Sequence, residues 1–183
     1  MNQATNGLDD DELLALARRD ADGGRVEEAL RKLKPLITRS EGPLDALAHT
    51  TLLGGLAEGL ARAGQIAEGL ATIEEALALC ERSEERWCAA ELARIKGELV
   101  LAQGAPQAAV AAEKCFLRAL DWARRRETLT WELRAATSLS RVWLRQGRSG
   151  DARGLLEPVY ERFTEGFRTL DLMSAKALLD TLR

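Results

Sequence analysis

Apolar side chains return every three or four residues along most of the chain, which is the spacing of one face of an α-helix. Between positions 53 and 77, for example, leucine or isoleucine stands at 53, 56, 60, 66, 70, 73 and 77. No stretch shows the two-residue alternation that is typical of a half-buried β-strand. The pattern therefore predicts an all-α protein.

Four glycines divide this pattern into similar blocks. Gly24, Gly64, Gly104 and Gly147 each follow one apolar helical stretch and precede another, so each is predicted to end a helix in the left-handed conformation. Successive glycines lie 40, 40 and 43 residues apart. A two-helix repeat of about this length is the signature of an α-solenoid.

The blocks predict nine helices. They form the pairs 10–22 with 25–39, 43–63 with 65–82, 85–103 with 106–126, and 130–146 with 149–165, followed by a helix at 171–182. We therefore expect an α-solenoid of four helix pairs plus a C-terminal capping helix, with a flexible tail at 1–8 and a single domain at 9–182. Pro35 and Pro158 fall inside predicted helices, which they should kink or end, and their matching places in the first and fourth pairs support the repeat.

Small and large residues within the pairs follow the spacing of the tetratricopeptide (TPR) motif. The second pair has Leu53, Leu56, Ala57, Leu60, Gly69, Ile73 and Ala76, and the fourth has Leu139, Ser140, Trp143, Ala152, Leu156 and Val159. The third pair fits with three extra residues near Gly104, and the first has Asp20 at a position that is usually apolar. The chain thus resembles TPR proteins, and the resemblance implies a right-handed solenoid whose first helices line a concave groove.

A longer stretch, from about His49 to Leu182, resembles the C-terminal repeat region of large bacterial signalling ATPases, which are often fused to a nucleotide cyclase or a winged-helix regulator. The matching segments are 91–99 (ELARIKGEL), 115–120 (CFLRAL), 131–139 (WELRAATSL), 158–160, 163–167, 171–172 and 175–179. That family's catalytic domains are not in this sequence. The resemblance therefore implies a signalling role for the repeats, without ATPase or cyclase activity in this chain.

The amino-acid composition limits the kinds of partner that the chain is expected to bind. The chain has 183 residues, 46% hydrophobic and 30% charged, with a net charge of −3, as expected of a soluble globular protein that does not bind nucleic acid. Without a signal peptide or a run of about 18 apolar residues, we expect a cytoplasmic protein that does not bind membranes. Cys80, Cys88 and Cys115 lack the spacing of a zinc site or a disulfide framework and are predicted to be buried free thiols.

Few residues in the sequence could support catalysis. His49 is the only histidine, no phosphate-binding glycine loop occurs, and the neighbouring carboxylates Glu74 and Glu75 point in different directions on a helix. We therefore expect no enzyme, no cofactor and no metal site. The scattered tryptophans at 87, 122, 131 and 143 are expected to fill gaps between repeats, rather than to build an aromatic ligand cage.

The repeat register aligns charged residues on the first helices of successive pairs. The three rows are Arg18, Glu58, Glu98 and Arg141; Asp22, Arg62, Ala102 and Arg145; and Asp11, Thr51, Glu91 and Arg134. Neighbours in these rows predict the ion pairs Arg18–Glu58, Asp22–Arg62 and Glu91–Arg134. Arg141 can pair with Glu98, whereas Arg145 has no acidic neighbour in its row.

Four arginines, Arg94, Arg134, Arg141 and Arg145, are the candidate site for a carboxylate or an acidic peptide, because guanidinium groups bind such anions through paired hydrogen bonds. We call them the arginine group. The alternative is a solvated surface with internal ion pairs. The sequence thus favours a noncatalytic module that binds a protein or peptide segment in its groove.

Two further functions stay open. One is self-association into a homo-oligomer, since the final helix is expected to present Leu172, Leu179 and Leu182. The other is a sensory subunit that controls a separate enzyme, as the resemblance to signalling ATPases implies.

Overall fold

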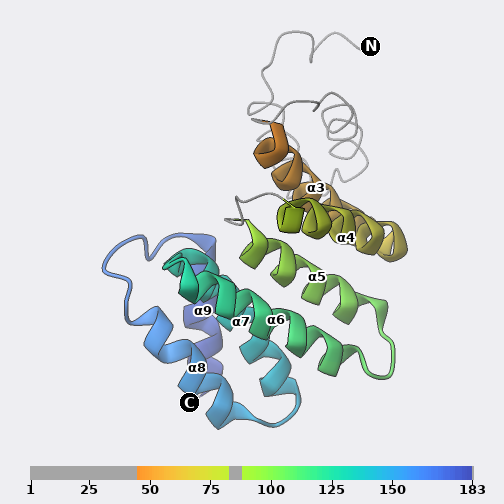
Figure 1. Ribbon diagram of the computed structural model, residues 1–183. Coiled ribbons are helices and arrows are strands. Elements are labelled where there is room, and N and C mark those ends of the chain that lie inside the picture. The colour runs from red at the N-terminus through yellow and green to blue at the C-terminus, as the bar shows by residue number, and fades with distance from the viewer. Residues whose placement is uncertain (1–44, 83–87, 183) are drawn as a thin grey trace, which may run out of the picture. The chain divides into compact units, whose positions relative to one another are not determined.

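Every secondary-structure element that the computed structural model describes, over residues 45–82 and 88–182, is an α-helix (Figure 1). The helices are α3 (Asp45–Arg62), α4 (Ile66–Arg82), α5 (Ala89–Gln103), α6 (Ala108–Arg125), α7 (Leu129–Arg145), α8 (Ser149–Tyr160) and α9 (Leu170–Thr181). The predicted all-α fold is confirmed. The tail at 1–8, the first helix pair, Gly24, Pro35 and Trp87 lie outside the described residues.

The chain divides into two compact units, one ending at Cys88 and the other beginning at Ala89. In the first unit, α3 and α4 pack as a helical hairpin. Leu60 and Ile73 are fully buried between them, beside the small Ala57 and Ala76. Small side chains thus let the two helices approach closely, while large ones fill the space that remains.

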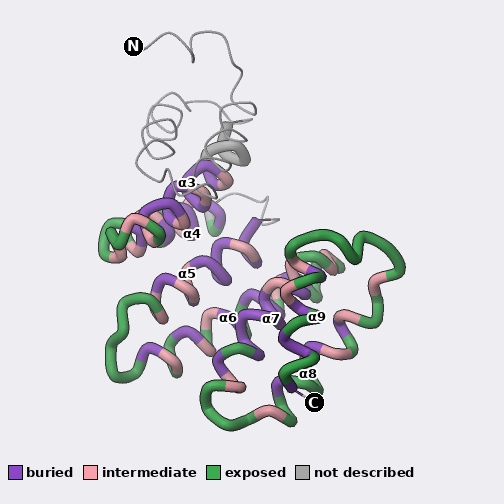
Figure 2. Tube along the Cα trace, turned by 180° about the vertical axis from the view of Figure 1, so that it is seen from behind, coloured by how far each residue is buried: buried purple, intermediate pink, exposed green. Residues whose placement is uncertain are grey.

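In the second unit, α5, α7 and α9 lie side by side, because α7 packs against both of the others. The helices α6 and α8 complete hairpins with α5 and α7, and α6 also packs on α7 (Figure 1). The core between them contains Phe116, Leu133, Leu139 and Leu156. Exposed residues collect in the turns and in the loop before α9 (Figure 2).

The small residues at the motif positions lie where two helices approach each other closely. A Cβ atom added to Gly97 of α5 would overlap the ring of Phe116 in α6, so only glycine permits this approach. Between α7 and α8, the Ser140 hydroxyl donates a hydrogen bond to the carbonyl oxygen of Ala152 at 3.0 Å, and both residues are fully buried. The small-and-large pattern therefore reflects close contact between helices.

Left-handed residues end the helices where the sequence predicts them. Gly64, Gly104 and Gly147 have φ angles of 77°, 70° and 76°, which confirms three predicted helix ends. The sequence predicts the end of α6 at 126 and the structure has it at Arg125, where Glu127 takes this conformation instead of a glycine, with φ 54°. The Thr128 N–H then donates a hydrogen bond to the carbonyl oxygen of Ala123, as in the turns at Gly64 and Gly147.

The end of α8 corrects a predicted boundary. The helix stops at Tyr160, two residues beyond Pro158, instead of continuing to 165. Proline has no N–H for the helical ladder, which agrees with the expectation that Pro158 would kink or end the helix. The chain then forms a loop, in which Phe163 packs against the core and Phe167 lies against Tyr160 with ring centroids 6.0 Å apart.

The expectation that α9 presents Leu172, Leu179 and Leu182 is wrong. All three are buried, with exposed fractions of 3%, 9% and 6%, because they are part of the core that α9 shares with α7 and α8. The large apolar residues of α9 that are exposed are Leu170 and Met173.

Candidate functional site

One face of α7 carries three members of the arginine group. Arg134, Ser138, Arg141 and Arg145 follow one another at intervals of four, three and four residues, so they share one side of the helix. On the adjacent α5, Glu91, Arg94 and Glu98 share one side in the same way, and Asp171 opens α9. We call these eight residues the charged face.

Arg94 is held by its own helix. Its Nε and Nη2 atoms donate to the two carboxylate oxygens of Glu91 at 3.0 and 2.8 Å, and its Nη1 lies 3.6 Å from Glu98 Oε1. The side chain is only 10% exposed. A nearly buried guanidinium with a two-pronged carboxylate partner is a positioned structural charge, not a group free to bind a ligand.

Arg134 joins three helices. Its Nη1 lies 2.6 Å from Glu91 Oε1 on α5, and its Nε lies 3.4 Å from Asp171 Oδ1 on α9. The predicted Glu91–Arg134 ion pair is therefore confirmed. A third of the Arg134 side chain stays exposed, so it can still reach a ligand at its outer edge.

The contacts of Glu98 correct the prediction for the row that contains Arg141. The hydroxyl of Ser138 donates to Glu98 Oε1 at 2.6 Å, and Arg94 lies on the same oxygen. The expected pairing of Glu98 with Arg141 is wrong, because Ser138, one turn before Arg141, faces the carboxylate. Arg18 and Asp22 lie outside the described residues, so the two pairs that involve them stay predictions.

Arg141 and Arg145 are exposed and stand one turn apart near the end of α7. Over residues 45–82 and 88–182, neither side chain has a hydrogen bond or an ion pair. The structure thus separates the arginine group into two internally neutralised members, Arg94 and Arg134, and two unneutralised ones. Sequence register alone distinguished only Arg145 in this way.

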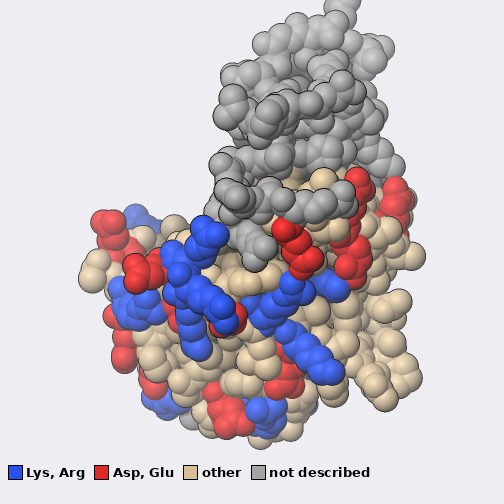
Figure 3. Space-filling view, viewed as in Figure 1, with Lys and Arg blue, Asp and Glu red and all other residues tan. Residues whose placement is uncertain are grey.

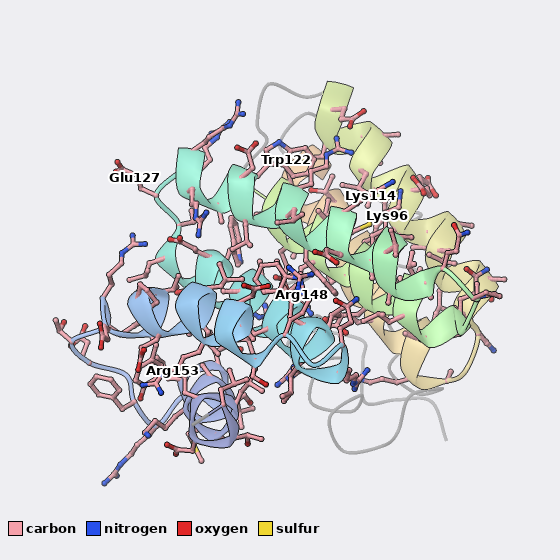
Figure 4. The ribbon with its side chains drawn as sticks, turned by 90° about the horizontal axis from the view of Figure 1, so that it is seen from below. Lys96, Lys114, Trp122, Glu127, Arg148 and Arg153 are labelled. Carbon is pink, nitrogen blue, oxygen red and sulfur yellow. The ribbon has the colours of Figure 1, made fainter. Side chains whose placement is uncertain are left out.

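The arginines of the turn after α7 and of α8 are paired within the second unit. Arg148 lies 2.9 Å from Asp151 and 3.2 Å from Glu113, and these carboxylates, Asp151 first, raise the pKa of its guanidinium. Arg153 makes a two-pronged pair with Glu157 along α8 (Figure 4). Neither is a free anion-binding group.

Trp122 and Trp143 lie against different arginines and do not form a cage together. Trp143 donates from Nε1 to Glu113 at 2.8 Å and lies under the Arg148 guanidinium, whereas Trp122 lies under Arg118 on α6. Both are half-buried against the core. This agrees with the expectation that they fill gaps.

One ionic cluster around a buried carboxylate was not predicted from the sequence. The carboxylate of Glu132, 6% exposed, lies 2.8 Å from Arg124 Nε on α6 and 2.5 Å from Arg162 Nη1 beyond α8. No sequence signal indicated it, because the three residues occupy different helices or loops. Because two arginines pair with it, the Glu132 carboxylate links α7 to α6 and to the segment after α8.

A second band of positive charge follows α6, over which Figure 3 shows Lys and Arg side chains. Lys114, Arg118, Arg124 and Arg125 are exposed there. Arg124 and Arg125 already pair with Glu132 and Asp121. Arg124 and Arg125 are therefore neutralised locally, unlike Arg141 and Arg145.

No group of three metal-binding side chains occurs within the described ranges. None of the helices described is both long and apolar enough to cross a membrane.

Comparisons with known proteins show the fold. A kinesin light chain-like protein of Podosopora anserina with nearly identical TPR-like repeats is 19% identical, with a TM-score of 0.65 over 93% of this chain and 82% of its own. BtubC (BKLC) of P. vanneervenii is 17% identical, with a TM-score of 0.72 over 94% of this chain and 70% of its own. No protein-family model and no curated protein matches the sequence. The chain therefore has a TPR-like, all-α solenoid fold, and the resemblance to bacterial signalling ATPases stays a prediction.

Proposed function

We propose that this chain is a noncatalytic protein-interaction module whose charged face binds an acidic protein segment. The observation that carries the proposal is the pair Arg141 and Arg145, exposed at one end of a face whose other charges neutralise one another. These two arginines are the primary contacts. Arg134 is a secondary contact, and Arg94 keeps Glu91 in place.

Electrostatics favour an acidic occupant. Two like charges one helical turn apart repel by about 0.2–0.5 kcal/mol, and a carboxylate between them removes that repulsion. Each guanidinium can also form two parallel hydrogen bonds with a carboxylate. Because the whole chain carries a net charge of −3, attraction must come from this local pair, so binding should weaken strongly with added salt.

The test uses a fluorescein-labelled synthetic peptide with glutamate at alternate positions and an otherwise identical peptide with glutamine. Fluorescence anisotropy of the full chain should show salt-sensitive binding of the glutamate peptide only. Replacing both arginines (Arg141→Glu with Arg145→Glu) should weaken binding by about tenfold or more, because attraction becomes repulsion.

The matched control is Lys114→Glu with Arg126→Glu. These residues are exposed, make no ion pair with another described residue, and give the same change in charge. Lys114 lies on α6 (Figure 4). Unaltered helical circular dichroism in both variants excludes unfolding. Equal weakening by both variants, or equal binding of the glutamine peptide, would contradict the proposal.

A more specific version of this proposed function is a regulatory role. The resemblance of residues 49–182 to the repeats of bacterial signalling ATPases supports a cytoplasmic sensory subunit that acts on a separate enzyme. Copurification of such an enzyme with the unmodified chain, but not with the Arg141→Glu and Arg145→Glu variant, would support that form.

Self-association is the second candidate. Phe167, Leu170 and Met173 expose 48%, 79% and 55% of their surfaces at the start of α9 and in the loop before it. Such residues favour contact with another copy of the chain. Light scattering across a range of protein concentrations decides this candidate, because a constant monomer mass excludes it.

A further inference from the structure

Two of the three cysteines meet in the first unit. Cys80 lies in the last turn of α4, and Cys88 immediately precedes α5. Their Sγ atoms are 3.8 Å apart, and both residues are almost completely buried, with exposed fractions of 1% and 5%. The Thr50 hydroxyl on α3 lies 3.3 Å from Cys88 Sγ. Three segments thus converge on one thiol pair.

The distance between the sulfurs is close to what a covalent bond requires. A disulfide has an S–S length of about 2.05 Å, so these atoms need to approach by less than about 2 Å. The seven intervening residues form no recognised cysteine motif, which is why the sequence predicted only free thiols. Cys115, on α6 of the second unit, serves as an internal reference.

We infer that Cys80 and Cys88 form a reversible intramolecular disulfide when the protein meets a hydroperoxide such as hydrogen peroxide. The Cys88 thiolate attacks one peroxide oxygen, the O–O bond breaks, and a sulfenic acid forms while the released hydroxide takes up a proton to become water. The sulfur of Cys80 then attacks the sulfenic sulfur, loses its proton, and expels the hydroxyl group as a second water. Two thiols and one peroxide give one disulfide and two waters.

The surroundings assign different roles to the two thiols. The hydrogen bond from Cys80 lowers the pKa of the Cys88 thiol from 9.0 to about 7, helped by Thr50 and the backbone N–H and opposed by burial. Since the thiolate is the nucleophile, Cys88 reacts first near neutral pH. Cys80, already in contact, is the resolving thiol.

The burial of Cys80 and Cys88 determines which oxidant can reach them and which product forms. A site with exposed fractions of 1% and 5% admits a small peroxide during local opening far more readily than the thiol of another protein. The expected product is therefore a bond within one chain. It ties the end of α4 to the residue from which the chain enters α5.

The test starts with the reduced full chain, treated with hydrogen peroxide, quenched with catalase, and alkylated with iodoacetamide under denaturing conditions. Intact mass should show a loss of two hydrogens and one alkylated cysteine, Cys115. Trypsin cleaves after Arg82 and Arg86, so the peptides that contain Cys80 and Cys88 are joined only by the disulfide. Dithiothreitol should separate them.

Variants sharpen the assignment of roles. The matched control Cys115→Ser should still form the bond, whereas Cys80→Ser should leave a sulfenic acid on Cys88 that dimedone labels. The rate of peroxide reaction should rise with pH through about 7, as Cys88 ionises beside Cys80 and Thr50. Three fully alkylated cysteines after treatment, oxidation of Cys115 first, or disulfide-linked dimers would each overturn the inference. The experiment on the unmodified chain decides it even if a variant does not fold.

Discussion

The two halves of the charged face contain the same residue type in different roles. Arg94 and Arg134 face Glu91, with Glu98 and Asp171 nearby, whereas no carboxylate of the described chain pairs with Arg141 or Arg145. The difference does not come from the arginines themselves. It depends on whether the same helix or a neighbouring one places an acidic side chain beside each arginine.

The halves therefore differ in what a mutation should cost. Charges in the paired half are partly removed from water, so loss of one partner leaves another charge without compensation. Charges in the exposed half keep their hydration, so their loss changes stability little. The proposed ligand binding therefore involves the end of the face opposite to the residues that stabilise the fold.

The largest effect on stability is expected at Glu91, the carboxylate that contacts both Arg94 and Arg134. Glu91→Gln removes the carboxylate that Arg94 and Arg134 share and should destabilise the fold by about 2–4 kcal/mol, because Arg94 stays nearly buried. Urea unfolding followed by circular dichroism measures this. The control Glu161→Gln, at an exposed residue with no ion pair to another described residue, should change stability by less than about 0.5 kcal/mol. Equal effects would remove the distinction between the two halves.

A smaller effect is expected at the junction of the two halves. Ser138→Ala removes the hydrogen bond to Glu98 and should cost about 1 kcal/mol, since the half-exposed carboxylate can turn toward water. Ser174→Ala on α9, where the serine makes no hydrogen bond to another described residue, controls for the helix preference of alanine. A stability difference near zero between the two variants would show that this hydrogen bond does not support the face.

The smallest effect is expected in the exposed half. Arg141→Ala combined with Arg145→Ala should raise stability by about 0.2–0.5 kcal/mol at low ionic strength, through relief of like-charge repulsion. This gain should vanish at about 1 M salt, where charges are screened within about 3 Å. Urea unfolding at the two salt concentrations measures it. A loss of more than about 1 kcal/mol would mean that these arginines are structural.

Local signals predicted most of the described fold. Glycine tolerates the left-handed conformation, so Gly64, Gly104 and Gly147 could be recognised as helix ends from their spacing alone. The left-handed conformation of Glu127 could not be recognised, because glutamate rarely takes it. Helical periodicity likewise extended α8 to 165, since apolar residues continue into a loop that packs on the core.

The candidate site was predicted less completely. Register placed Glu91 opposite Arg134 correctly, but it placed Arg141 opposite Glu98, where the structure has Ser138. A count of residues locates a neighbouring side chain only to about one helical turn. Ion pairs require contact within a few ångströms, and that precision comes from packed helices.

By itself, the sequence determined the helical hairpins, their boundaries at glycine, and the small residues that let them pack, because these follow from interactions between residues close in the chain. Tertiary structure alone decided which arginines are neutralised, that the leucines of α9 face inward, and that Cys80 meets Cys88. The physical reason is that charge pairing, burial and sulfur contact depend on distances across helices, and periodicity along a chain does not contain those distances.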